Sequence, residues 1–167
     1  MSYRGTVFSM GLALGLISAP ALAQDRAGQF YFGPKAGAMV ADVSGMDAAF
    51  NGGVTAGYAL AGAAVEAEIT TSLINGDTSL SGVEWDITTM ALYGAFRTYG
   101  NIYAKIRAGI LREDITPDDG NFSASGDDTG LSYSLGAGYR LPNQDRMEIE
   151  YTVVEQDVSF ISLGYLF

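Results

Sequence analysis

Apolar and polar residues alternate one by one along much of this chain. In the segment Asn101–Leu111, isoleucine and alanine take every second position, and Tyr103, Lys105 and Arg107 stand between them. A period of two places these two sets of side chains on opposite faces of a β-strand, whereas a helix repeats its faces about every 3.6 residues. The pattern therefore predicts a protein built from β-strands.

Eight segments carry this alternation and are predicted to be strands. They are Phe30–Val40, Phe50–Leu60, Ala63–Ser72, Val83–Arg97, Asn101–Leu111, Gly130–Arg140, Arg146–Val154 and Val158–Phe167. The connections alternate between tight turns and longer polar segments, apart from a short final junction, Glu155–Asp157. The turns are Ala61-Gly62, Thr98–Gly100 and Leu141–Asp145, and the longer segments are Ala41–Ala49, Thr71–Gly82 and Arg112–Thr129. This order predicts one all-β domain, an eight-stranded antiparallel up-and-down barrel whose two ends face different surroundings.

The sequence does not decide which face of Val83–Arg97 points into the barrel. One face carries Trp85 and Ile87, and the other begins with polar residues but continues with Met90, Leu92 and Phe96. A β-bulge in this segment would exchange its two faces midway.

Composition excludes several classes of function. The 167 residues include no Cys and no His, so thiolate metal sites and histidine-dependent catalytic triads are excluded. A net charge of −10 argues against a nucleic-acid partner, because phosphate binding needs a basic surface. A carboxylate could still act as a base, but nothing in the sequence positions a nucleophile beside one. We therefore expect no enzymatic activity, no cofactor and no metal.

The first 23 residues are predicted to be a cleaved signal peptide. Arg4 supplies a positive charge, residues 7–17 are apolar, and Ala21-Leu22-Ala23 forms a small-residue cleavage site before Gln24. The alternative, a membrane-anchoring helix, needs a longer apolar stretch. Residues 1–23 are thus assigned to the signal peptide and residues 24–167 to the barrel domain of an exported protein.

The charges on the polar faces indicate which side of the barrel meets lipid. Four are cationic and four are anionic: Lys35, Glu66, Glu68, Lys105, Arg107, Arg140, Glu148 and Glu150. Their sum of zero suits a closed lumen, where each buried charge needs a partner. The apolar faces would then meet lipid, as in a membrane barrel; a soluble barrel has the inverse arrangement.

Aromatic residues on the apolar faces gather near the predicted strand ends, as in the girdles of membrane barrels. Near the short turns these are Phe30, Phe32, Tyr58, Tyr139, Tyr165 and Phe167, and near the long connections Phe50, Trp85, Tyr133 and Phe160. The chain ends on the alternating apolar residues Ile161, Leu163, Tyr165 and Phe167, with no polar tail. This ending resembles the C-terminal signature that the outer-membrane assembly machinery recognises in bacterial barrels.

With these features the chain resembles the small bacterial outer-membrane β-barrels, related to the outer membrane protein A barrel and the opacity-type porin family. Residues 30–37, Phe-Tyr-Phe-Gly-Pro-Lys-Ala-Gly, are similar to the opening of the first strand in that family. The resemblance implies that Lys35 points into the lumen and pairs with glutamates of other strands. It also implies contact with lipid, lipopolysaccharide, periplasmic chaperones and the assembly machinery. Pro34 departs from a regular strand because it lacks a backbone donor.

The segment Arg112–Thr129 is rich in acidic residues and is predicted to be a solvated loop. Within it, Asp118-Asp119-Gly120-Asn121 has oxygen ligands that suit Ca²⁺, but the EF-hand spacing and terminal Glu are missing.

We therefore expect a monomer in the cell outer membrane with a structural or surface-exposed role and at most weak porin-like permeability. Two alternatives remain open. One is a soluble periplasmic barrel of the lipocalin type that binds an apolar ligand, and the other is an adhesin that acts through its long loops.

Overall fold

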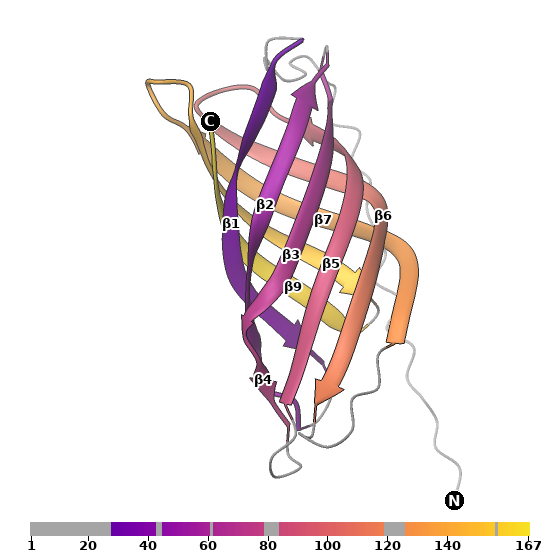
Figure 1. The fold of residues 1–167 in the computed structure, drawn as a ribbon. Coiled ribbons are helices and arrows are strands. Elements are labelled where there is room, and N and C mark those ends of the chain that lie inside the picture. Colours follow the sequence, from indigo (N-terminus) through magenta and orange to yellow (C-terminus); the bar gives the residue numbers. More distant parts are fainter. Residues whose placement is uncertain (1–27, 43–44, 61, 79–83, 119–125, 156) are drawn as a thin grey trace, which may run out of the picture.

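The computed structural model describes residues 28–42, 45–60, 62–78, 84–118, 126–155 and 157–167. The predicted signal peptide and its cleavage site lie outside these residues. Within them, eight long antiparallel strands form a closed, tilted barrel (Figure 1). These strands are β1 (Phe30–Ala41), β2 (Ala49–Ala59), β3 (Ala64–Ile74), β5 (Glu84–Arg97), β6 (Ile102–Asp118), β7 (Gly126–Arg140), β8 (Arg146–Glu155) and β9 (Val158–Leu166). A two-residue strand, β4 (Gly76–Asp77), extends the sheet beside β5.

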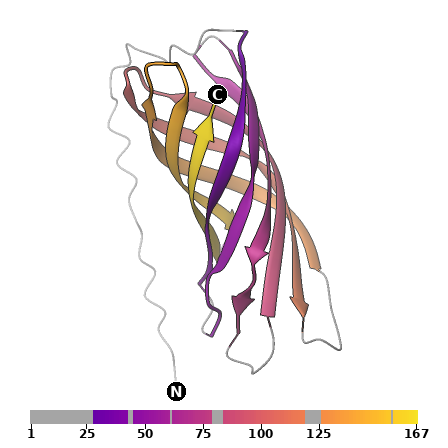
Figure 2. The same cartoon turned by 60° about the vertical axis from the view of Figure 1, so that its left-hand side comes forward.

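Each long strand pairs with the strand that follows it in sequence, and β1 pairs with β9 to close the barrel. The turned view in Figure 2 shows the same single ring of strands, with the C-terminus beside β1. At this seam Phe32 and Phe167 exchange two backbone hydrogen bonds of 3.1 and 3.0 Å. The predicted eight-stranded up-and-down topology is therefore confirmed.

Strands β6 and β7 are longer than the hydrophobic pattern predicts. They pair from Ile102↔Tyr139 to Ile115↔Gly126, so most of the segment Arg112–Thr129 is a β-hairpin rather than a loop. This expectation was wrong because hydrophobic alternation marks only strands with one face against an apolar environment. Where a hairpin is polar on both faces, its residues have the composition of a loop.

Strand β5 keeps the same face toward the lumen along its whole length. Its register with β6 continues without a shift from Glu84↔Asp118 to Arg97↔Lys105, so no bulge exchanges the faces. Trp85 is consequently buried in the lumen, as is Phe160 of β9. The prediction that these two residues belong to the outer aromatic girdle was wrong, because an aromatic residue suits a packed lumen as well as lipid.

The outer surface of the barrel is apolar. Exposed side chains occupy alternate positions on the strands; those on β6 and β7 are Ile102, Ile106, Ile110, Leu131, Tyr133, Leu135 and Tyr139. Near the short turns the exposed aromatics contact one another: the ring centroids of Phe30 and Tyr58 are 4.8 Å apart, and those of Phe32 and Phe167 are 4.6 Å apart. This belt suits lipid on the outside of the barrel.

No helix in the described part of the chain is long and apolar enough to cross a membrane.

The lumen is filled in three layers. Toward the long connections lies an apolar layer that includes Met39, Trp85, Ile87, Leu111 and Phe160. Toward the short turns lies a smaller apolar layer with Tyr31, Ala59, Ala64, Ala95 and Leu166. Between them the strands present buried charged side chains, such as Lys35 on β1, which stands between Tyr31 and Met39 in sequence. The central charges thus have an apolar layer on either side along the barrel.

Candidate functional site

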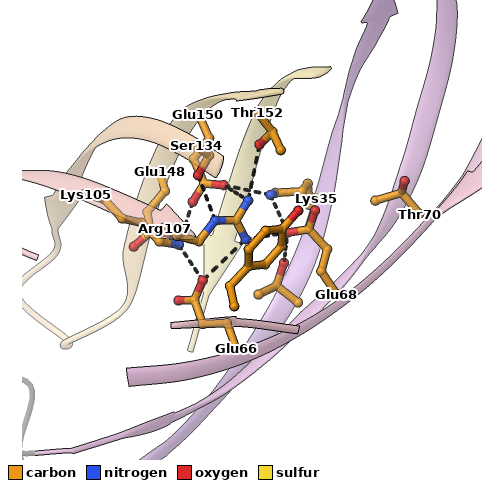
Figure 3. Close-up of polar contacts among 12 residues, drawn as sticks. Lys35, Glu66, Glu68, Thr70, Lys105, Arg107, Ser134, Glu148, Glu150 and Thr152 are labelled. Atoms are coloured by element: carbon orange, nitrogen blue, oxygen red, sulfur yellow. Dashed lines mark hydrogen bonds and ion pairs between the residues drawn. The ribbon is translucent and has the colours of Figure 1, made fainter. Parts of the chain in front are cut away.

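Eight charged side chains form one connected cluster in the middle of the lumen, which we call the lumenal cluster. Its members are Lys35, Glu66, Glu68, Arg97, Lys105, Arg107, Glu148 and Glu150, and all are buried. The carboxylates come from β3 and β8, whereas the cations come from β1, β5 and β6. Figure 3 shows most of these side chains converging from different strands. Because the pairing order places β3 and β8 on opposite walls, the cations lie between two acidic walls.

Lys105 and Arg107 are the central cations of the lumenal cluster. The Lys105 ammonium nitrogen lies 3.0 Å from Glu66, 2.6 Å from Glu148 and 2.5 Å from Glu150. The Arg107 guanidinium lies 2.7 Å from Glu68, 2.6 Å from Glu150 and 3.4 Å from Glu66. It also donates hydrogen bonds to Ser134 and Thr152. Each of these cations therefore ties β3 to β8 across the lumen.

Lys35 and Arg97 likewise each contact one glutamate on β3 and one on β8. Lys35 lies 2.6 Å from Glu68 and 2.8 Å from Glu150. Arg97 pairs with Glu66 and lies 2.9 Å from Glu148. Each of the four carboxylates consequently contacts at least two cations, which offsets part of the cost of removing the charges from water.

Two tyrosines extend the lumenal cluster toward the short turns. The Tyr31 hydroxyl donates to Glu66 at 2.7 Å, and the Tyr103 hydroxyl donates to Glu148 at 2.7 Å. Each ring lies against a glycine: a Cβ added at Gly57 would come within 2.2 Å of the Tyr31 ring, and one at Gly138 within 2.3 Å of the Tyr103 ring. These glycines are needed because only a residue without a side chain admits the rings at this depth.

The guanidinium of Arg97 also lies 5.1 Å from the Tyr31 ring centroid, and that of Arg146 lies 4.2 Å from it. Such cation–π contacts add a second favourable environment for these buried cations.

The structure brings together seven of the eight residues that the sequence assigns to a lumenal network. The eighth, Arg140, is half-buried at the turn end of β7, opposite Arg146 in the register. Arg97 occupies the lumenal cluster instead, a position that its sequence pattern did not predict. Its face of β5 carries one polar residue, Thr89, among Trp85, Ile87, Ala91, Tyr93 and Ala95, so the pattern marks it as largely apolar rather than as part of a charged lumen.

The acidic segment offers no metal site in the described residues. No group of three or more acidic side chains is placed there to hold a metal ion. Glu113 is buried and Asp114 is exposed, so the two neighbours point to opposite faces of β6. Of the calcium-like sequence Asp118–Asn121, residues 119–121 lie outside the described part of the chain.

A closed antiparallel barrel with an apolar exterior and a charged, paired interior defines a transmembrane β-barrel of the outer-membrane type. Residues 10–160 match the model of the outer membrane protein beta-barrel domain family. The chain therefore belongs to this family and is an outer-membrane protein.

Solved structures share this fold at low sequence identity. Neisserial surface protein A is 15% identical, with a TM-score of 0.67 over 82% of this chain and 95% of that one. Ail, the attachment invasion locus protein of Yersinia pestis, is 16% identical, with a TM-score of 0.54 over 84% and 99% of the two chains. The N-terminal barrel domain of Pseudomonas aeruginosa OprF is 16% identical, with a TM-score of 0.51 over 84% and 99%. A comparison with curated proteins found no similar sequence.

Proposed function

We propose that this protein is a monomeric outer-membrane barrel with a structural or surface-exposed role and at most weak porin-like permeability. The observation that carries this proposal is the lumenal cluster, in which Lys105 and Arg107 connect the opposite walls β3 and β8. Eight strands enclose an interior about wide enough for side chains alone. A path through the barrel would require several of these ion pairs to separate.

The two apolar layers strengthen the proposal of weak permeability. An ion that enters from the long connections meets Trp85, Ile87 and Phe160 before it reaches the lumenal cluster. Passage would require both the displacement of these side chains and the loss of charge pairs, and an unpaired buried charge costs several kcal/mol. Permeability should therefore be weak at most.

Planar-bilayer recordings test the proposed permeability. The wild-type protein should show no stable channel, whereas a variant that combines Trp85→Ala, Phe160→Ala and the paired change Lys105→Ser with Glu150→Ser should conduct measurably. The paired change keeps the lumen neutral, so the difference reports on the space that is opened. Stable, large channels in the wild-type protein would contradict the proposal.

We propose no catalytic role for the lumenal cluster. A general base needs a carboxylate that can accept a proton near a positioned nucleophile. Here Glu66, Glu68, Glu148 and Glu150 are each held by at least two cations, and apolar layers lie on both sides of them. An ion-pairing role explains this arrangement better than a chemical one.

The proposed partners are those of an integral outer-membrane protein: lipid and lipopolysaccharide around the apolar belt, and periplasmic chaperones and the assembly machinery during insertion. The exposed side chains of Ile161 and Leu163 on β9, and of Phe167 directly after it, support recognition of the C-terminal segment. The lipocalin-like alternative gains no support, because the apolar side chains face outward. The adhesin alternative rests on the long connections, and one feature supports it: toward these connections β7 continues beyond its last pair with β8.

A further inference from the structure

Toward the long connections, β7 extends beyond the point where its pairing with β8 stops. Its last register pair toward the long connections is Tyr133↔Val153, whereas β7 pairs with β6 as far as Gly126. Among the described residues, the stretch Gly126–Ser132 therefore has a strand neighbour on one side only. In Figures 1 and 2 this end of β7, in orange, extends beyond the yellow strands β8 and β9. We call this stretch the β7 edge.

Ser132 marks the point where the two strands separate. Its hydroxyl donates to the backbone carbonyl of Val153 at 2.6 Å and also lies 3.0 Å from the Tyr93 hydroxyl. Beyond this residue, every second residue of the β7 edge directs its backbone N–H and C=O groups toward the side where β8 no longer pairs with it. Such an edge is a ready template for another strand.

Space is available beside the β7 edge. A cavity of about 240 Å³ lies between the edge and the end of β8, lined among others by Leu111, Glu113, Asp128 and Val153. A Cβ placed on Gly130 would have no heavy atom within 4 Å, and Leu131 is 83% exposed. The cavity thus lies beside the position that an added strand would take, and the two faces of the β7 edge at Gly130 and Leu131 are uncovered.

The two faces of the β7 edge differ in character. On the lumenal side, Glu113 and Asp128 line the cavity, while on the outer side Leu131 and Tyr133 continue the apolar belt. Arg112, next to Glu113 in sequence, is exposed on the outer face of β6, whereas Glu113 is buried on the lumenal face. Because side chains of a strand alternate, an added strand would direct one set toward the carboxylates and the other toward Leu131.

We propose that the β7 edge binds an extended segment of a partner protein by strand addition, and that this segment alternates basic and apolar residues. Its basic side chains face Glu113 and Asp128, and its apolar side chains lie beside Leu131 at the margin of the lipid belt. A second copy of this chain is disfavoured, because it would bring another Asp128 to the same groove and place like charges on paired strands. The proposal is independent of whether the lumen conducts.

Strand addition predicts a distinctive dependence on the peptide backbone. The test uses the full barrel domain in lipid nanodiscs and the synthetic peptide Lys-Val-Lys-Val-Lys-Val-Lys. Two N-methylated forms are compared, one methylated on the valines and one on the lysines. In an antiparallel pair only alternate residues face the partner, so one form should bind at least about tenfold more weakly and the other should bind nearly as well as the parent peptide. Binding should also slow amide exchange at residues 128–132.

Matched protein variants separate the groove from general charge attraction. Asp128→Lys should weaken binding at least about fivefold, whereas Asp114→Lys, which makes the same charge change on the exposed outer face of β6, should change it less than about twofold. A peptide of the same composition with its lysines in one block serves as the control. No binding of the alternating peptide, equal binding of both methylated forms and the block peptide, or self-association through the β7 edge would each overturn the proposal.

Discussion

The ammonium nitrogen of Lys105 on β6 lies 3.0 Å from Oε2 of Glu66 on β3, so a single ion pair crosses the lumen between strands that are not neighbours in the sheet. The same nitrogen lies within hydrogen-bond distance of Glu148 and Glu150 on β8. Lys105 is 1% exposed, and it is therefore a buried cation shared by three carboxylates.

Replacement of Lys105 by methionine should destabilise the folded barrel by about 3–5 kcal/mol, because three carboxylates then share fewer cations in a buried site. Urea unfolding in lipid vesicles, followed by heat-modifiable gel migration, measures this change. Arg112→Met is the matched control, since it removes a positive charge from an exposed position and should stay within about 0.5 kcal/mol of the wild type. If the two variants unfold alike, the lumenal cluster contributes nothing to stability.

Gly138→Ala should lower stability by about 1–3 kcal/mol, because its Cβ would overlap the Tyr103 ring and displace the hydroxyl that donates to Glu148. Gly94→Ala provides the comparison, since a Cβ there meets only the carbonyl oxygen of Ala108, at 3.8 Å. The Gly94 variant should be neutral or slightly stabilised in the same unfolding experiment. Equal losses at both positions would show that ring packing is not the cause.

Fluorescence of Trp85, the single tryptophan of the chain, should resist quenching by brominated lipids, because its ring lies inside the lumen and its indole N–H donates to the carbonyl of Asp47 at 3.0 Å. A variant with Trp85→Phe and Leu92→Trp moves the fluorophore to the lipid-facing side of the same strand, where Leu92 is 58% exposed. That variant should be strongly quenched. Strong quenching of the wild-type protein would place Trp85 outside the barrel.

Phe167→Ala should reduce assembly of the barrel in cells while leaving refolding from urea into vesicles nearly unchanged, if the assembly machinery recognises the C-terminal residue. Phe32→Ala is the control, because it removes the other half of the Phe32–Phe167 ring contact but keeps the terminal phenylalanine. The amount of heat-modifiable protein in the outer-membrane fraction is the measurement. Equal assembly defects in both variants would indicate a packing role alone.

Much of the lumenal cluster can be predicted from the sequence, because alternation assigns Lys35, Glu66 and Lys105 to the face opposite the apolar one. Arg97 could not be found in this way, since both faces of its strand are largely apolar and the lumenal face is shared with Trp85 and Ile87. Hydrophobicity separates two faces only when their environments differ. In the apolar layers of the lumen, both faces of a strand meet apolar surroundings, so hydrophobicity does not separate them.

The polar hairpin at the ends of β6 and β7 shows a second limit of the sequence. Its residues have the composition of a loop, yet backbone pairing continues from Arg112↔Thr129 to Ile115↔Gly126. Hydrogen bonds between strands use backbone groups that every residue except proline carries. Side-chain composition therefore gives little sign of where such a hairpin begins.

The barrel follows from the sequence alone, because alternation of period two sets the strands and the alternating lengths of the connections set the up-and-down order. The outward direction of the apolar faces, the pairing of the charges, the aromatics that fill the lumen and the separation of β7 from β8 follow only from the folded structure. Strand periodicity is local and is written in neighbouring residues. The contacts of Lys105 with Glu66, or the open space beside Gly130, depend on the closure of the ring and on the register of strands distant in the chain.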